Sequence, residues 1–125
     1  MAIRIIGLIK RRPDITLEEF KERWGTRHAG ILVSTRAVRE KIVRYSQFHV
    51  LTQPSEALAA AGVPIAPYDG MAEMWVDKIE DLLELFQDEE FQKNVLPDEA
   101  NFLPENRENM LVLVGEDQPK YERAE

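Results

Sequence analysis

Four short runs of β-forming residues alternate with two helical patterns along this chain, in the order strand, helix, strand, strand, helix, strand. We expect the strands at residues 3–10, 42–51, 69–76 and 109–115. Right-handed crossovers convert this order into a four-stranded antiparallel sheet with both helices on one face. The order therefore predicts an α+β fold of the ferredoxin-like βαββαβ type.

The first helix carries a strong local start signal. Thr16 precedes Glu19 by three residues, which predicts a capping box, and Ile15 and Phe20 have the spacing of a hydrophobic staple. Gly30 is the expected end of this helix, and a short second helical piece should follow it.

The second helix and two irregular segments give weaker signals. Asp77 and Glu80 repeat the capping pattern and predict a helix that Asp77 caps. Its apolar stripe is expected to consist of Ile79, Leu82, Leu83 and Phe86. Residues 53–68 contain three prolines and should form a long loop with one helical turn at 55–61, and residues 92–106 should be irregular.

A chain of 125 residues fits one domain, which we place at residues 1–116, followed by a polar tail at 117–125. Two helices cover only one face of the expected sheet, so the other face would expose Val, Ile, Met and Trp side chains to water. A second copy packed face to face would cover them. We therefore expect a homodimer that joins its sheet faces into a dimeric α/β barrel.

The composition narrows the classes of function. The net charge is -7, but residues 1–50 carry 11 Lys and Arg against 5 Asp and Glu. This pattern favours a small anionic ligand over nucleic acid, because no basic stripe with interleaved aromatic residues is present. The chain has no cysteine, and therefore no disulfide, thiolate nucleophile or cysteine-based metal site. No apolar run approaches the roughly 20 residues that span a membrane, and we expect a cytoplasmic protein.

Three polar side chains share one face of the expected strand at 42–51. Alternation places Tyr45, Gln47 and His49 together, and such a row is costly on a dry apolar surface unless it meets a polar ligand. His49 and Tyr45 are therefore candidate catalytic residues, and Gln47 is a candidate substrate-binding residue. Two other interpretations stay open, namely a solvated strand face and a hydrogen-bonded core histidine.

His28 is the second candidate catalytic histidine. It follows Trp24 by four residues, so both lie on the buried face of the helix, where Trp24 is expected to contact substrate. Two histidines can divide acid and base roles, although a histidine near a helix C-terminus is also favoured as a cation by the helix dipole. A third metal ligand at suitable spacing is missing, so no metal is expected.

Four further residues are candidate substrate contacts. Asp69 and Glu73 lie four residues apart on the third strand, with Trp75 on the same face, and either carboxylate can orient a histidine or accept a proton. Arg36 can hold a carboxylate through two parallel hydrogen bonds. The alternatives are a turn for Asp69, a salt bridge to Arg4 for Glu73, a core position for Trp75 and a solvated surface for Arg36.

Two segments resemble a known family. The stretch LIKRRPDITLEEFKERWGTRHAGIL and the later DGMAEMWVDKIEDLLELF are similar to the EthD-type branch of the dimeric α/β-barrel superfamily. Within that branch, VREKIVRYSQFHV resembles the fungal polyketide-pathway decarboxylases of the atrochrysone carboxylic acid type. The resemblance implies a cofactor-independent enzyme that acts on an aromatic or poly-keto small molecule, and it favours a pocket-lining position for His28.

The leading hypothesis is loss of carbon dioxide from an aromatic or β-keto polyketide carboxylic acid, with His49 as the acid that protonates the enolate carbon. Tyr45 or His28 would hold the oxygen on which charge develops. Aldol cyclisation with loss of water and cofactor-free oxygenation stay open, since enolate formation serves all three reactions. Two further alternatives are a non-catalytic dimeric protein that binds a hydrophobic metabolite, and a haem-handling protein with a histidine ligand.

Overall fold

The computed structural model describes residues 2–105 and 110–124. Its sheet has the strand order β2-β3-β1-β4, and each neighbouring pair is antiparallel. The strands are β1 (Ile3–Ile9), β2 (Arg44–His49), β3 (Gly70–Val76) and β4 (Val112–Gly115). This arrangement confirms the predicted α+β fold with a four-stranded antiparallel sheet. The expected start of the last strand at residue 109 lies outside the described residues.

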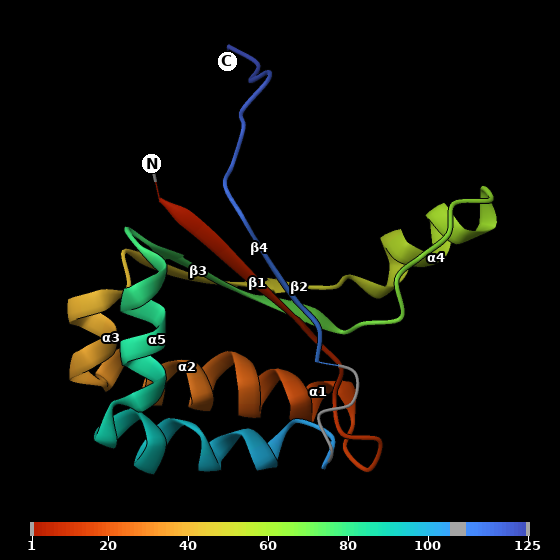
Figure 1. The fold of residues 1–125 in the computed structure, drawn as a ribbon. Coiled ribbons are helices and arrows are strands. Elements are labelled where there is room, and N and C mark those ends of the chain that lie inside the picture. Colours follow the sequence, from red (N-terminus) through yellow and green to blue (C-terminus); the bar gives the residue numbers. More distant parts are fainter. Residues whose placement is uncertain (1, 106–109, 125) are drawn as a thin grey trace.

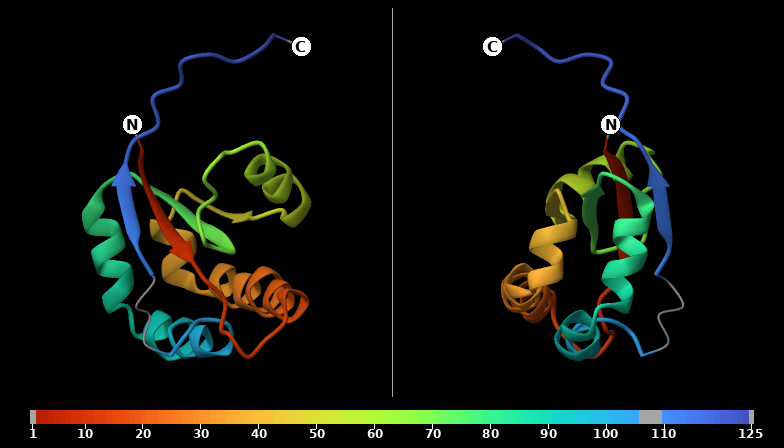
Figure 2. Two further views of the ribbon diagram at one scale, coloured as in Figure 1. Left: turned by 90° about the vertical axis from the view of Figure 1, so that its right-hand side faces the viewer. Right: turned by 60° about the vertical axis from the view of Figure 1, so that its left-hand side comes forward.

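A layer of helices covers one face of the sheet (Figure 1, Figure 2). Its N-terminal part consists of α1 (Leu17–Phe20), the π-helical segment η1 (Lys21–His28), α2 (Ala29–Ser34) and α3 (Arg36–Lys41). Its C-terminal part consists of α5 (Ile79–Gln87), η2 (Phe91–Val95) and η3 (Pro97–Asn101). The two parts lie side by side, because α3 contacts α5, α2 contacts η2 and η1 contacts η3.

The start of the first helix confirms the capping prediction. The Thr16 hydroxyl accepts a hydrogen bond from the Glu19 N–H at 3.1 Å, and the Glu19 carboxylate accepts one from the Thr16 N–H at 3.0 Å. Ile15 and Phe20 are buried in one core cluster, as a staple requires. The predicted end at Gly30 is wrong, since the helix continues through it to the end of α2, where apolar residues pack into the core.

Two predictions for the second half of the chain are wrong. Asp77 does not cap α5, because Lys78 occupies the N-cap position in extended conformation and no side chain forms a capping hydrogen bond there. The stretch 92–106 is helical and not irregular over most of its described part, in η2 and η3, and residue 106 lies outside the described residues. Pro97 opens a new helical segment at η3, a position where proline is favoured.

The apolar stripe of α5 is narrower than predicted. Leu82 and Leu85 are buried, whereas Leu83 and Phe86 are 55% and 46% exposed. The Phe86 ring lies 5.9 Å from the Phe91 ring instead of entering the core. Burial in α5 thus follows the spacing of Leu82 and Leu85, with Leu83 turned toward solvent.

The segment between β2 and β3 contains a full helix, α4 (Thr52–Ala60), where a loop with a single turn is predicted. The helix is followed by Gly62, whose φ of 93° is readily adopted only by glycine. None of the α4 residues is buried, and the helix projects away from both the sheet and the helical layer (Figure 1). It therefore contributes nothing to the core.

The sheet has one covered face and one open face. On the covered face, Tyr45 is paired in register with Met74, and both pack against the core beneath the helices. The open face carries Phe48, Leu111 and Leu113, which are 52%, 55% and 60% exposed. A large apolar surface is therefore left uncovered by the helices of this chain.

Candidate active site

A cavity of about 480 Å³ lies between the covered sheet face and the helical layer. It borders both core clusters, one through Leu82 and the other through Phe102. The lining is mainly apolar, and its polar side chains are His28, Tyr45 and Glu99. Among the described residues, no lysine or arginine lines it. Its volume and composition are typical of sites for small organic molecules.

His28 and Asp98 form a buried pair at the wall of this cavity. His28 Nδ1 lies 2.9 Å from Asp98 Oδ2, and the two side chains are 8% and 5% exposed. A carboxylate only accepts hydrogen bonds, so Nδ1 carries the proton and Nε2 of the neutral ring keeps its lone pair. Because His28 lines the cavity, Nε2 is the nitrogen available to a ligand. The ring packs edge-on against Phe102 at 4.7 Å.

The charge of His28 follows from this environment. Burial lowers the pKa of the imidazole, and the hydrogen bond to Asp98 opposes that shift without reversing it. The ring is therefore neutral near pH 7 and can act as a base. An imidazolium formed after proton uptake would be stabilised by the Asp98 carboxylate.

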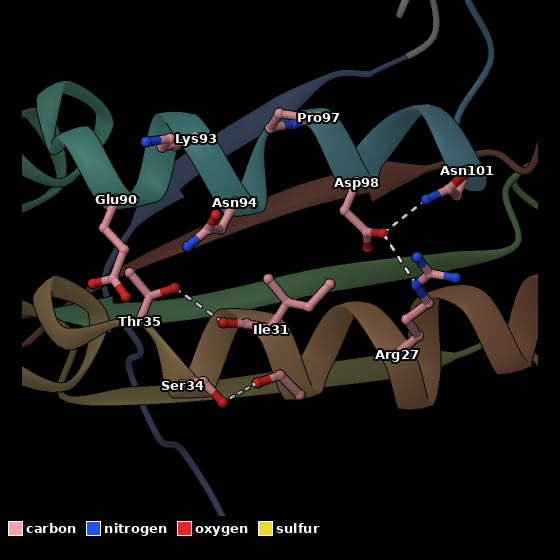
Figure 3. A pocket seen from close by; sticks show the side chains of 11 residues that line it. Arg27, Ile31, Ser34, Thr35, Glu90, Lys93, Asn94, Pro97, Asp98 and Asn101 are labelled. Carbon is pink, nitrogen blue, oxygen red and sulfur yellow. Dashed lines mark hydrogen bonds and ion pairs between the residues drawn. The ribbon is translucent and has the colours of Figure 1, made fainter.

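Asp98 is held from the outer side of the helical layer (Figure 3). Asn101 Nδ2 donates to its Oδ1 at 2.8 Å, and Arg27 Nε lies 3.5 Å from the same oxygen. Asp98 lines an outer groove of about 790 Å³ between the two halves of the helical layer, whereas His28 lines the cavity. The pair thus connects the outer groove to the cavity.

Tyr45, Gln47 and His49 form a row of hydrogen bonds along β2. Gln47 Nε2 donates to the Tyr45 oxygen at 2.8 Å and to the Trp24 carbonyl at 3.0 Å, and His49 Nε2 lies 2.8 Å from Gln47 Oε1. The His49 ring stacks on the Trp24 ring at 4.6 Å. Tyr45 and Trp24 line the cavity, whereas Gln47 and His49 do not and contact these two residues instead.

Two of these groups have shifted acidities. Burial raises the pKa of Tyr45, partly offset by the hydrogen bond from Gln47, so the phenol stays protonated at neutral pH. Burial lowers the pKa of His49, and the positive charge of Lys21 lowers it further. Tyr45 and His28 line the cavity. His49 does not line it, and is connected to Tyr45 through the Gln47 side chain.

The candidate contacts on β3 lie elsewhere. Glu73 and Trp75 are on the open face, where Arg4 forms an ion pair with Glu73 and its guanidinium lies 5.0 Å from the Trp75 ring. Asp69 precedes β3 and accepts a hydrogen bond from the Arg11 backbone N–H at 2.8 Å. None of the three borders the cavity, because alternation along β3 directs Ala72 and Met74, and not Glu73, to the covered face.

Arg36 also lies away from the cavity. Its side chain is 79% exposed, with Nε 3.4 Å from Glu40, and its backbone N–H donates to Glu90. This position gives no geometric support to a carboxylate clamp. It matches the alternative of a solvated surface residue.

Asp98, Glu99 and Phe102 are polar or aromatic site residues that the sequence analysis missed. All three come from the stretch interpreted as irregular, and Asp98 lies 70 residues from its partner His28. The one available signal was Pro97, since proline at the first turn of a helix indicates that the following residues are helical. Helical spacing would then have placed Asp98 and Phe102 on the same face.

No metal centre is formed by the part of the chain that the structure describes, in which no group of three or more His, Asp or Glu side chains could hold an ion. His28 and His49 are hydrogen-bonded to different partners, Asp98 and Gln47. Within residues 2–105 and 110–124, no helix is long and apolar enough to cross a membrane.

The fold is similar to solved structures that share few identical residues with it. An ethyl tert-butyl ether D (EthD) family protein from Bacillus halodurans C-125 matches with a TM-score of 0.64 and 17% identity, over 94% of this chain and 100% of that one. A dimeric protein of unknown function and ferredoxin-like fold from Bacteroides fragilis NCTC 9343 matches with a TM-score of 0.59 and 13% identity, over 93% and 96%.

A hydroxynitrile lyase from Passiflora edulis matches with a TM-score of 0.61 and 11% identity, over 97% of each chain. At these identities the likeness shows the fold. No curated protein sequence matches the chain. A family model of the EthD domain, however, matches residues 12–105, which include His28, Tyr45 and Asp98. The chain therefore belongs to the EthD domain family.

Proposed function

We propose that this protein is a cofactor-independent carbon–carbon lyase that removes carbon dioxide from an aromatic or β-keto carboxylic acid of the polyketide class. The observation that carries the proposal is the buried His28–Asp98 pair beside an apolar cavity that Tyr45 also lines. The resemblance of residues 38–50 to fungal polyketide-pathway decarboxylases supports the substrate class. A lyase among proteins of the same fold supports the reaction class.

The cavity favours a substrate that enters as the neutral acid. Its described lining contains no lysine or arginine, and an unpaired carboxylate is costly to transfer into apolar surroundings. In a β-keto acid, or an aromatic acid in its keto tautomer, the carboxyl group lies β to a carbonyl. The electron pair of the breaking carbon–carbon bond then has an acceptor within the substrate itself.

His28 serves in turn as base and acid. Its neutral Nε2 takes the proton of the carboxylic acid, and the carbon–carbon bond breaks to release carbon dioxide. The electron pair of that bond passes to the carbonyl oxygen as an enolate. The imidazolium, stabilised by Asp98, returns the same proton to the carbon. The acid is thus converted to carbon dioxide and a C–H bond, without an oxidant or reductant.

Tyr45 stabilises the oxygen on which negative charge develops. Its protonated hydroxyl donates to the enolate oxygen in mainly apolar surroundings, where such a bond has a large effect. Carbon dioxide leaves as a neutral molecule, so the leaving group needs no cation. This favours decarboxylation over expulsion of an anion from the same cavity.

Release of carbon dioxide tests the proposal directly. The purified protein is incubated with a panel of β-keto acids and ortho-hydroxy aromatic acids, and carbon dioxide and organic products are measured. We expect release from at least one acid, with loss of one carbon from the product. Tight binding of these acids without turnover would instead identify a metabolite-binding protein. A cyclised product formed with loss of water would favour the cyclase alternative.

We also propose a homodimer that buries the open sheet faces and resides in the cytoplasm. Phe48, Leu111 and Leu113 are more than half exposed on that face, which is unfavourable for a monomer in water. A similar fold from Bacteroides fragilis is described as dimeric, and the cysteine-free composition suits a reducing compartment. Light scattering of the purified protein tests the dimer, and a monomer at micromolar concentration would contradict it.

A further inference from the structure

We propose that Gln47 is a positioning residue, whose carboxamide joins His49 to Tyr45 in a one-way series of hydrogen bonds. We call this series, from His49 through Gln47 to Tyr45, the Gln47 relay. It fixes the Tyr45 hydroxyl as a donor toward the cavity. Its catalytic consequence rests on the proposed function, whereas the direction of its hydrogen bonds does not.

The direction follows from which atoms can donate. The Trp24 carbonyl only accepts, so the Gln47 atom 3.0 Å from it is the amide nitrogen. The second proton of that nitrogen goes to the Tyr45 oxygen at 2.8 Å. The amide oxygen then faces His49 Nε2 at 2.8 Å, and because this oxygen only accepts, Nε2 must carry a proton. Reversing the amide would bring two acceptors together at Trp24.

The relay decides what Tyr45 offers to a ligand. Since the Tyr45 oxygen accepts from Gln47, its own proton must point elsewhere, and the side chain lines the cavity. Tyr45 therefore presents a donor to the cavity and Nε2 of His28 an acceptor, beside the Glu99 carboxylate that also lines it. A ligand that offers a carbonyl oxygen to Tyr45 and an acidic proton to His28 pairs both groups. A ligand of the opposite polarity leaves both unpaired, which is costly in a buried site.

The first helix is shaped to admit the relay. The Trp24 carbonyl belongs to the π-helical segment η1, a widened form of helix that occurs often at functional sites. A Cβ atom on Gly25 would lie 3.0 Å from His49 Cε1 and 3.7 Å from Gln47 Oε1. Glycine at this position therefore allows both side chains to approach the helix closely.

Nitrogen-15 NMR of the His49 ring tests the relay without any substrate. We expect neutral His49 to carry its proton on Nε2 in the wild type, and mixed tautomers in Gln47→Leu. Gln47→Glu keeps the shape but can only accept, so Tyr45 must turn its proton toward the new carboxylate and its pKa should rise. Tyr45→Phe assigns the tyrosine titration. A proton on Nδ1 of wild-type His49, or an unchanged Tyr45 titration in Gln47→Glu, would overturn the proposal.

Kinetics with an active acid test the catalytic consequence. Removal of one donor to a developing oxyanion lowers kcat roughly 100- to 1000-fold, which we expect for Tyr45→Phe. Gln47→Leu should lower kcat by a smaller factor and leave KM nearly unchanged, because Gln47 does not line the cavity. Ser46→Ala, on the other face of β2, is the matched control. A Gln47→Leu variant that loses only substrate affinity would contradict the positioning role. If no acid is decarboxylated, the NMR results still decide the relay.

Discussion

His28 Nδ1 lies 2.9 Å from Asp98 Oδ2, although 70 residues separate the two along the chain. The first comes from the π-helical segment η1 and the second from η3, and contact between these segments holds the pair together. An imidazole buried with a carboxylate on one nitrogen has a fixed tautomer, which leaves its other nitrogen as the one that can accept a proton from a ligand. This relationship underlies the first two predictions.

Removal of the proposed base, His28, should strongly lower turnover. His28→Ala is expected to lower kcat for carbon dioxide release by about 100- to 10,000-fold, the usual contribution of general acid–base catalysis. Asp98→Asn should lower it by a smaller factor, because the imidazolium loses its counter-charge. Glu40→Gln, which changes an exposed carboxylate paired with Arg36, should leave kcat unchanged. Equal rates in His28→Ala and wild type would rule out His28 as the base.

The pH dependence should report the neutral form of His28. Burial lowers the pKa of this imidazole below its ordinary value of about 6.5. The base is therefore present above that pH and is lost as the pH falls through the lowered pKa. We expect kcat, measured at saturating acid so that ionisation of the free substrate does not enter, to be flat above about pH 6.5 and to fall only at lower pH. Asp98→Asn removes the opposing effect of the carboxylate and should move this fall to still lower pH.

Two glycines of the first helix should respond differently to alanine. A Cβ on Gly30 meets nothing within 4 Å, so Gly30→Ala should raise the free energy of unfolding by about 0.5–1 kcal/mol through helix propensity. Gly25→Ala places its Cβ 3.0 Å from His49 Cε1, so the ring must move and the stability gain should be lost. Urea denaturation measures both variants. An equal gain for the two would show that His49 does not pack against Gly25.

The burial pattern of α5 predicts unequal effects for two leucines. Leu85 is fully buried and Leu83 is 55% exposed. Leu85→Ala should lower the free energy of unfolding by about 2–5 kcal/mol, the usual cost of emptying a core position. Leu83→Ala should change the free energy of unfolding by less than about 0.5 kcal/mol, because its side chain is already exposed to solvent. Chemical denaturation of both variants measures the difference, and a reversed order would refute this helix register.

The open sheet face should control the oligomeric state. Phe48→Glu puts a charge on the open sheet face, within the proposed dimer interface, and should give a monomer by light scattering, because an unpaired buried charge is costly. Val33→Glu makes the same kind of change on α2, where Val33 is 49% exposed on the helical layer, and should remain a dimer. A Phe48→Glu variant that stays dimeric would place the interface elsewhere.

Local signals in the sequence predicted most of the fold. The capping box at Thr16 and the alternation along β2 involve neighbours within a few residues, and both are present in the structure. Alternation also grouped Tyr45, Gln47 and His49 on one face. The cap at Asp77 failed because the same short pattern arises without a helix starting at that residue, and α5 begins after Lys78.

The site was harder to predict because it depends on contacts between distant segments. Alternation within β3 correctly grouped Glu73 with Trp75, but pairing with β2 decides that this group lies on the face opposite Tyr45. Asp98 reaches His28 only because η3 packs on η1. Neither contact can be predicted from the spacing of residues that are close together in the sequence. The sequence therefore suggested His49 as the leading histidine, whereas the geometry favours His28.

A single strand, β3, forms a wall of the cavity with Ala72 and Met74 and a part of the open surface with Glu73 and Trp75. Insertion or deletion of one residue within it would exchange these two sets of side chains at once. New ligand preferences must therefore evolve in this strand by replacement of residues and not by changes in its length. Length changes are better tolerated in the segment that contains α4, where no side chain of the helix is buried.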